Sequence, residues 1–84
     1  MLSSWWRSSI VAAVSSGGSV YVVDTFNNRI QKFTSEGVFV SKWGTAGTGD
    51  GQLSYPYDIT VAPDGSVYVV DLGNDRIQRF APGP

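Results

Sequence analysis

The chain has 84 residues, with six Lys and Arg against seven Asp and Glu, and a formal net charge of −1. It contains no Cys and no His, which excludes disulfides, thiolate metal sites and imidazole ligands for zinc, copper or iron. The size allows one small domain that buries only about 60% of its unfolded surface, and the charge balance offers no basic field for nucleic acid or anionic lipid.

Four short strands are predicted in the first half of the chain, over residues 10–14, 19–24, 29–34 and 38–43. They are rich in Val, Ile, Phe and Tyr, and Gly or Asn turns separate them, which is typical of an antiparallel meander. The apolar run 10–14 is too short for the core of a signal peptide, and no segment is long enough to span a membrane.

A glycine-rich connector, residues 44–56, leads to three further strands at 58–62, 66–71 and 76–80. Pro63-Asp64-Gly65 predicts a tight turn between the first two of these strands. In 66–71, Val67 and Val69 alternate with Tyr68 and Val70, so both faces of this strand are expected to be covered.

The two halves of the chain are copies of each other. Residues 18–33 return as 65–80 at a constant offset of 47, and 12 of these 16 positions are identical. A repeat of this length is one supersecondary unit that cannot bury its apolar faces alone. With no disulfide or metal to staple the chain, association with further units is the expected source of stability.

The succession of a strand, Pro-Asp-Gly, Val-Tyr-Val-Val-Asp and Asn-Asp-Arg-Ile-Gln-Arg-Phe resembles NHL repeats, as does the connector Gly-Thr-Ala-Gly-Thr-Gly-Asp-Gly-Gln-Leu-Ser-Tyr-Pro. The resemblance implies an all-β fold with two four-stranded propeller blades, and most often six blades in the closed ring. The first copy departs from the pattern at Ser15-Ser16-Gly17, which replaces the Pro-Asp-Gly turn, and at Phe26, where the second copy has Gly73. We expect these departures to weaken the entry hairpin of the first unit.

The second copy ends before its fourth strand, and the beginning of the chain resembles that missing strand. Met1, Leu2 and Trp5 align with Phe39, Val40 and Trp43 in one register. Residues 1–6 are therefore predicted to complete the blade of a neighbouring copy, residues 10–43 to form a complete blade, and residues 57–80 to supply three strands of another.

Complementary ends of this kind produce a ring or a fibre. We expect a homotrimer that closes a six-bladed ring, with a ring of another blade number or a domain-swapped dimer as alternatives. The predicted assembly residues are Met1, Leu2, Trp5, Trp6, Ile77 and Phe80.

Polar residues recur at one place in both copies, namely Asp24, Asn27, Asn28, Arg29 and Asp71, Asn74, Asp75, Arg76. They could be a carboxylate pair or oxygen ligands for calcium. A group needed once per active site is not expected once per repeat, so the favoured interpretation is a hairpin turn in which Asp and Asn bond nearby backbone. The glycine-rich connector lacks the Lys-Ser or Lys-Thr and the following helix of a phosphate loop, so a flexible crossover is expected there.

Tyr55, Tyr57 and Asp58 are the candidate ligand-binding residues, since aromatic rings beside a carboxylate suit a sugar, a peptide or a cation. Packing between blades is the alternative for this segment, and core or interface packing is expected for Trp5, Trp6 and Trp43.

Three function classes remain, and the favoured one is a structural or ligand-binding module without catalysis or cofactor, for which a peptide or carbohydrate is the expected ligand. The family resemblance also implies RNA binding, as in tripartite-motif proteins, or a sensor. A remnant of the metal-dependent amidating lyases is the enzyme alternative, but those enzymes use His-bound zinc, which this chain cannot supply. A natural, truncated or designed piece of a longer propeller has the same organisation.

Overall fold

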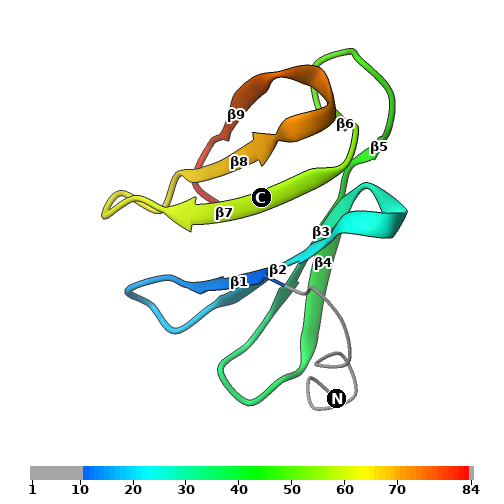
Figure 1. Cartoon of the computed structure of the whole chain (residues 1–84). Helices are drawn as coiled ribbons and strands as arrows, with labels where there is room; N and C mark the ends of the chain where they lie inside the picture. The colour runs from blue at the N-terminus through cyan, green and yellow to red at the C-terminus, as the bar shows by residue number, and fades with distance from the viewer. Residues whose placement is uncertain (1–10, 84) are drawn as a thin grey trace.

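The structure, a computed structural model, describes residues 11–83 and consists of two antiparallel β-sheets that lie face to face (Figure 1). The first sheet has four strands in sequential order, β1 (Val11–Val14), β2 (Val20–Asp24), β3 (Arg29–Phe33) and β4 (Phe39–Trp43). The second has three, β7 (Pro56–Val61), β8 (Val67–Asp71) and β9 (Arg76–Phe80). The predicted all-β architecture is confirmed, with strand bounds that differ from the expected ones by two residues or fewer.

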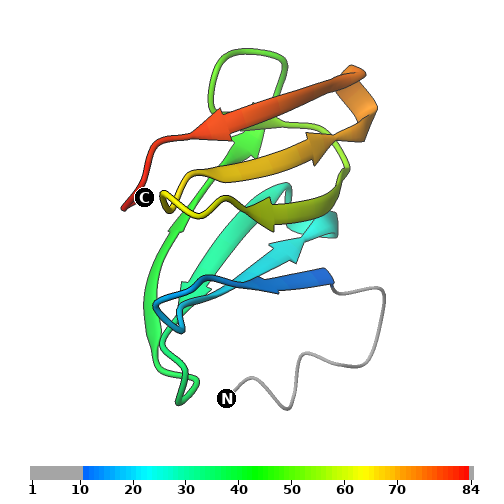
Figure 2. The same cartoon turned by 90° about the vertical axis from the view of Figure 1, so that its left-hand side faces the viewer.

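The connector between the sheets contains a short parallel pair, β5 (Thr45–Ala46) and β6 (Gln52–Leu53). The sequence predicted only a flexible crossover here, and the expectation was incomplete because this pairing depends on contacts with the second sheet. In Figure 2 the connector runs along one side of the molecule and bends back toward β7.

Equivalent turns in the two sheets have the same backbone geometry. Gly65 has φ = 90° and its N–H bonds the Ala62 carbonyl at 2.9 Å, and Gly18 has φ = 88° and bonds the Ser15 carbonyl at 3.0 Å. The glycine supplies the left-handed conformation that a side chain would strain. The first copy therefore keeps the turn without Pro-Asp, and the expected weakening of this hairpin is not seen in its geometry.

A 3₁₀ turn follows each of two equivalent strands: η2 (Thr25–Asn27) follows β2, and η3 (Leu72–Asn74) follows β8. Each turn ends on a residue in the left-handed region, Asn28 or Asp75, both at φ = 52°. Asn and Asp tolerate this conformation better than other residues with a Cβ atom. The turns place the polar residues that follow β2 and β8 at the same edge of their sheets.

The core lies between the two sheets. It joins one face of the first sheet to one face of the second, and β7 packs against β1 and β2. Its buried members are Tyr21, Val23, Ile30, Leu53, Ile59, Val67 and Val69. The Trp43 ring lies edge-on to both Tyr21 and Phe80, with centroids 6.0 and 5.5 Å away, an arrangement that aromatic pairs favour.

The other face of the second sheet is not covered within the chain. Tyr68 and Val70 are only half-buried, and Ile77 is 67% exposed. Within the described residues a neighbouring sheet lies on one side of β8 only, so the single chain does not supply the cover that is predicted for the other side of residues 66–71.

The predicted assembly residues Met1, Leu2, Trp5 and Trp6 lie outside the described residues. Within residues 11–83, no helix has the length and apolarity needed to cross a membrane.

Candidate functional site

Four polar side chains at one edge of the second sheet form a hydrogen-bonded group that we call the second clamp: Asp71, Asn74, Arg76 and Gln78. Asp71 is fully buried at the end of β8. Its carboxylate forms an ion pair with Arg76 Nε at 2.8 Å and accepts the Asn74 and Gln78 amides at 2.9 and 3.2 Å. A buried carboxylate requires such partners.

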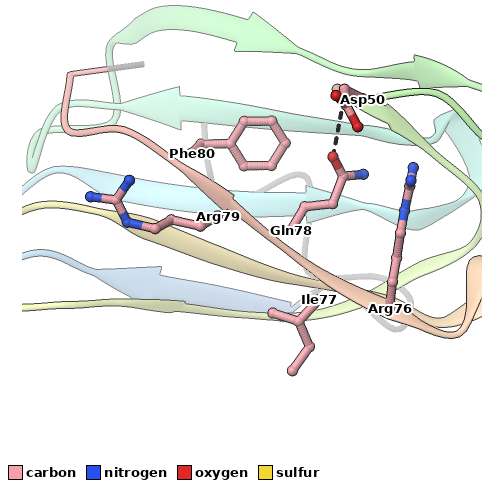
Figure 3. A pocket seen from close by; sticks show the side chains of 7 residues that line it. Asp50, Arg76, Ile77, Gln78, Arg79 and Phe80 are labelled. Atoms are coloured by element: carbon pink, nitrogen blue, oxygen red, sulfur yellow. Dashed lines mark hydrogen bonds between the residues drawn. The ribbon is translucent and has the colours of Figure 1, made fainter.

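The second clamp holds the backbone of the connector. Asp71 accepts the Ser54 N–H at 2.7 Å. Gln78 accepts the Gly51 N–H (Figure 3) and donates to the Gln52 carbonyl. Arg76 Nη2 donates to the carbonyls of Gly49 and Gln52, each at 2.8 Å, and the Asn74 amide donates to that of Gly47. The clamp therefore recognises peptide groups rather than connector side chains.

Hydrogen bonding governs the titration of Asp71. Burial raises its pKa, but the bonds from the Ser54 backbone, Asn74, Arg76 and Gln78 outweigh burial and hold the pKa below its ordinary value. The carboxylate stays charged at neutral pH, which makes it a poor proton donor for acid-base catalysis.

The first clamp, defined as Asp24, Asn27, Arg29 and Gln31, has the same four residues 47 positions earlier. Asp24 again pairs with Arg29 Nε at 2.8 Å, and the Asn27 amide donates to both carboxylate oxygens. Gln31 is 5% exposed, and its Nε2 has no hydrogen-bond partner in the described part of the chain. The first clamp thus keeps the bonds from Asn and Arg to its carboxylate, but within the described residues it lacks both the glutamine–aspartate bond and the connector bonds of the second clamp.

The sequence favoured a structural role for these clusters, with local bonds in a hairpin turn as the explanation. Local bonds are present, but the explanation was incomplete, because the longest-range contacts of the second clamp reach residues 24–27 positions away. Gln31 and Gln78 were not singled out as site residues. Their identity in the two copies, directly before a basic residue and Phe, was the available signal.

The turns also touch the connector at its far end. Asn28 Oδ1 accepts the Tyr55 N–H at 2.9 Å, and Thr25 Oγ1 donates to the Pro56 carbonyl at 2.9 Å. Tyr55 has φ = 50°. The segment that enters β7 is therefore fixed by both sheets.

The candidate ligand-binding residues fall into two places. Tyr55 and Tyr57 are 48% and 55% exposed, and their rings stack with centroids 6.4 Å apart and an angle of 22°. Asp58 instead accepts a hydrogen bond from the N–H of the next residue, Ile59. It lies on the outer face of the second sheet, where it lines an apolar hollow of about 250 Å³ together with Thr60, Tyr68, Val70 and Ile77.

The remaining predicted assembly residues, Ile77 and Phe80, are on opposite sides of β9 (Figure 3). Phe80 packs on Trp43 between the sheets, and Ile77 points to the exposed outer face. Among residues 11–83, no three His, Cys, Asp or Glu side chains come together as a metal site.

Comparison with known proteins agrees with the repeated architecture. Brain tumor protein of Drosophila melanogaster is 43% identical over 49 residues, which are 58% of this chain and 5% of that protein. Peptidylglycine alpha-amidating monooxygenase of Rattus norvegicus is 38% identical over 58 residues, 63% of this chain and 6% of that protein. The chain thus spans a small part of these relatives. The NHL repeat model matches residues 11–33 and 53–80, one match in each sheet and together more than half of the sequence, so the chain belongs to the NHL repeat family.

Proposed function

We propose that this chain is a non-catalytic, propeller-forming NHL module that functions by assembling with other copies of itself and by binding a ligand. The family and the two facing sheets support a binding or structural module. The sequence contains no His and no Cys, and an arginine pairs with the carboxylate of each clamp. Both observations argue against acid-base or zinc chemistry.

The packing between the two sheets is the observation that carries the assembly proposal. In this interface Tyr21, Val23 and Ile30 of the first sheet face Val67 and Val69 of the second. The repeat places identical residues on the face of each sheet that points away from this interface. Tyr68, Val70 and Ile77 are at the positions of the first group, and Val20 and Val22 at those of the second.

The outer face of the second sheet can therefore receive the first sheet of another copy in the way seen inside the chain. Val22 is already buried in the single chain, so this docking requires a rearrangement on that face. Residues 1–6 would pair with the β9 edge of the neighbour as a fourth strand. Such a contact is heterologous, and three copies would close a six-bladed ring.

Mass in solution tests the assembly. We expect a homotrimer, and Ile77→Lys should shift the mass toward the monomer because it places a charge in an apolar contact. Val38→Lys is the matched control, since Val38 is similarly exposed, at 61%, but lies in the turn between β3 and β4. A monomeric wild type, or equal effects of the two variants, would contradict the proposal.

The stacked Tyr55 and Tyr57 support a sugar or peptide as the ligand, because two exposed rings offer an aromatic surface. A screen of carbohydrates and peptides tests this part of the proposal. We expect a ligand to quench tyrosine fluorescence in a saturable way, and we expect this quenching to be lost in Tyr55→Ala and in Tyr57→Ala. Amidating activity is not proposed on the basis of a match to 6% of the monooxygenase.

A further inference from the structure

Two Asp-Gly pairs in the chain have the same chemistry but different surroundings. Asp50-Gly51 lies in the connector, and Asp64-Gly65 lies in the turn between β7 and β8. Both aspartates are exposed. A glycine that follows an aspartate has no Cβ atom to hinder its backbone nitrogen from attacking the preceding side-chain carboxyl. The two pairs are therefore candidate sites for the same modification in one molecule.

The Asp64-Gly65 pair is held by its hairpin. The Asp64 carboxylate accepts the Ser66 N–H at 2.9 Å and the Ser66 hydroxyl at 3.1 Å. These bonds, the backbone one first, hold the pKa of Asp64 below its ordinary value. The Gly65 N–H bonds the Ala62 carbonyl at 2.9 Å, and a Cβ atom placed on Gly65 would lie 3.4 Å from Pro82. Neither reacting group of this pair can move without opening the turn.

The Asp50-Gly51 pair is held less firmly. Among residues 11–83, the Asp50 carboxylate has no hydrogen-bond or ion-pair partner, and a Cβ atom placed on Gly51 would meet nothing within 4 Å. Both residues line an open hollow of about 590 Å³ beside β9 (Figure 3). The Gly51 N–H is held by a side chain, because it donates to Gln78 Oε1 at 3.0 Å. The carboxyl of this pair is free to move, and one bond from the second clamp restrains its nitrogen.

From this contrast we infer that Asp50 is a site of isomerisation to isoaspartate, and that Gln78 restrains the reaction. The Gly51 nitrogen gives its proton to water and forms a bond to Asp50 Cγ, and the carboxyl loses one oxygen as water to leave a five-membered succinimide. Water from the hollow then adds to the main-chain carbonyl carbon of residue 50. The bond from that carbon to the Gly51 nitrogen breaks, and the nitrogen regains a proton. One water is lost and one is gained, and the inference does not depend on the proposed function.

The modification acts on the second clamp. Isoaspartate adds one carbon to the main chain between two groups that the clamp holds, the Gly49 carbonyl on Arg76 at 2.8 Å and the Gly51 N–H on Gln78 at 3.0 Å. It also places a free α-carboxylate at the hollow. We expect the Gly51 N–H to leave Gln78, so that a chemical change in an exposed turn loosens the contacts of a buried group.

The test is incubation of the folded full chain at pH 7 in water enriched in heavy oxygen, with isoaspartate located by mass spectrometry of peptides. We expect isoaspartate to form at least about tenfold faster at residue 50 than at residue 64, because two hydrogen bonds restrain the Asp64 carboxylate. Each isoaspartate should carry one heavy oxygen atom. In concentrated urea the two rates should become similar, since the folded structure separates them.

Gln78→Leu tests the restraint. It removes the acceptor of the Gly51 N–H and should raise the ratio of the two rates about fivefold, the effect of one ordinary hydrogen bond. Gln31→Leu, the same change at the equivalent position of the first clamp, is the matched control and should leave the ratio unchanged. General unfolding exposes both pairs and lowers the ratio, and the wild-type comparison decides the matter if Gln78→Leu does not fold.

The purified isoaspartate form provides a further readout. Its Gln78 side-chain amide should shift in the NMR spectrum, and its urea midpoint should fall by about 1 M, as expected for the loss of one or two hydrogen bonds. Similar rates at the two pairs in the folded chain, a preference for residue 50 that persists in urea, or equal effects of the two glutamine variants would overturn the inference. Isoaspartate without heavy oxygen would contradict the succinimide route.

Discussion

Replacing Asp71 by Asn isolates the energetic role of the second clamp. Asn keeps the shape of the side chain, removes the charge opposite Arg76, and turns one acceptor oxygen into an N–H₂ group that faces donors. Removal of one member of a buried ion pair costs about 3–5 kcal/mol. Because Arg76 is 28% exposed and can be hydrated, we expect a loss of about 3 kcal/mol in unfolding free energy.

Asp24→Asn is the matched control. Asp24 forms the same ion pair at the same 2.8 Å distance, but it lacks the Ser54 N–H and the glutamine amide that Asp71 accepts. Each hydrogen bond is worth about 1 kcal/mol, so the control should lose about 1 kcal/mol. Chains of this size have a total stability of about 4–12 kcal/mol, and the difference between the variants is therefore measurable.

Urea unfolding followed by tryptophan fluorescence and far-ultraviolet circular dichroism provides the measurement. With a slope of about 1.5 kcal/mol per molar urea, the midpoint should fall by about 2 M for Asp71→Asn and by less than about 1 M for Asp24→Asn. Both variants are measured at one chain concentration, since self-association changes apparent stability. Equal midpoints for the two variants would refute the claim that the connector bonds distinguish the clamps.

Two further predictions concern the same edge of the second sheet. Gly73→Ala should lower the free energy of unfolding by about 1–3 kcal/mol, because the new Cβ meets the Ser54 carbonyl. Phe26, at the equivalent position of the first sheet, is 76% exposed, and Phe26→Ala should change the free energy of unfolding by less than about 0.5 kcal/mol. Since hydrogen bonds lower the pKa of folded Asp71, its stabilising contribution should be complete above the ordinary aspartate pKa of about 4 and decrease as pH falls through the lower folded value. Urea midpoints between pH 6 and pH 2 should show this decrease, with a weaker pH dependence in Asp71→Asn; a midpoint that rises on acidification would contradict the sign.

The strands and turns could be predicted from sequence because their signals are local. Alternation of Val and Tyr identified β2 and β8, and Pro-Asp-Gly identified the turn before β8. The repeat identified the two sheets as equivalent units, and the family resemblance implied that these units are propeller blades. The first strand was correctly placed even though its turn lacks Pro-Asp, because Gly18 alone supplies the required backbone conformation.

The clamps could be only partly predicted, since their specificity arises from tertiary contacts. Recurrence of Asp, Asn and Arg indicated a structural role, but nothing near Asp71 in sequence indicates that it accepts the Ser54 N–H. The pairing of Tyr55 with Tyr57 and the separation of Asp58 depend on the left-handed backbone at Tyr55 and on the irregular register between Pro56 and Asp58. A regular alternating strand would not predict either arrangement.

The hydrogen bonds from the second clamp to residues 47–54 all go to main-chain atoms, and this makes the linker between the sheets tolerant of changes in its amino-acid sequence. Thr48 and Asp50 are exposed, and neither contributes a side chain to the clamp. Substitutions at these two positions, whether natural or introduced to graft recognition residues, should therefore preserve the path of the linker. The scaffold thus offers two positions where new binding specificity could evolve at little structural cost.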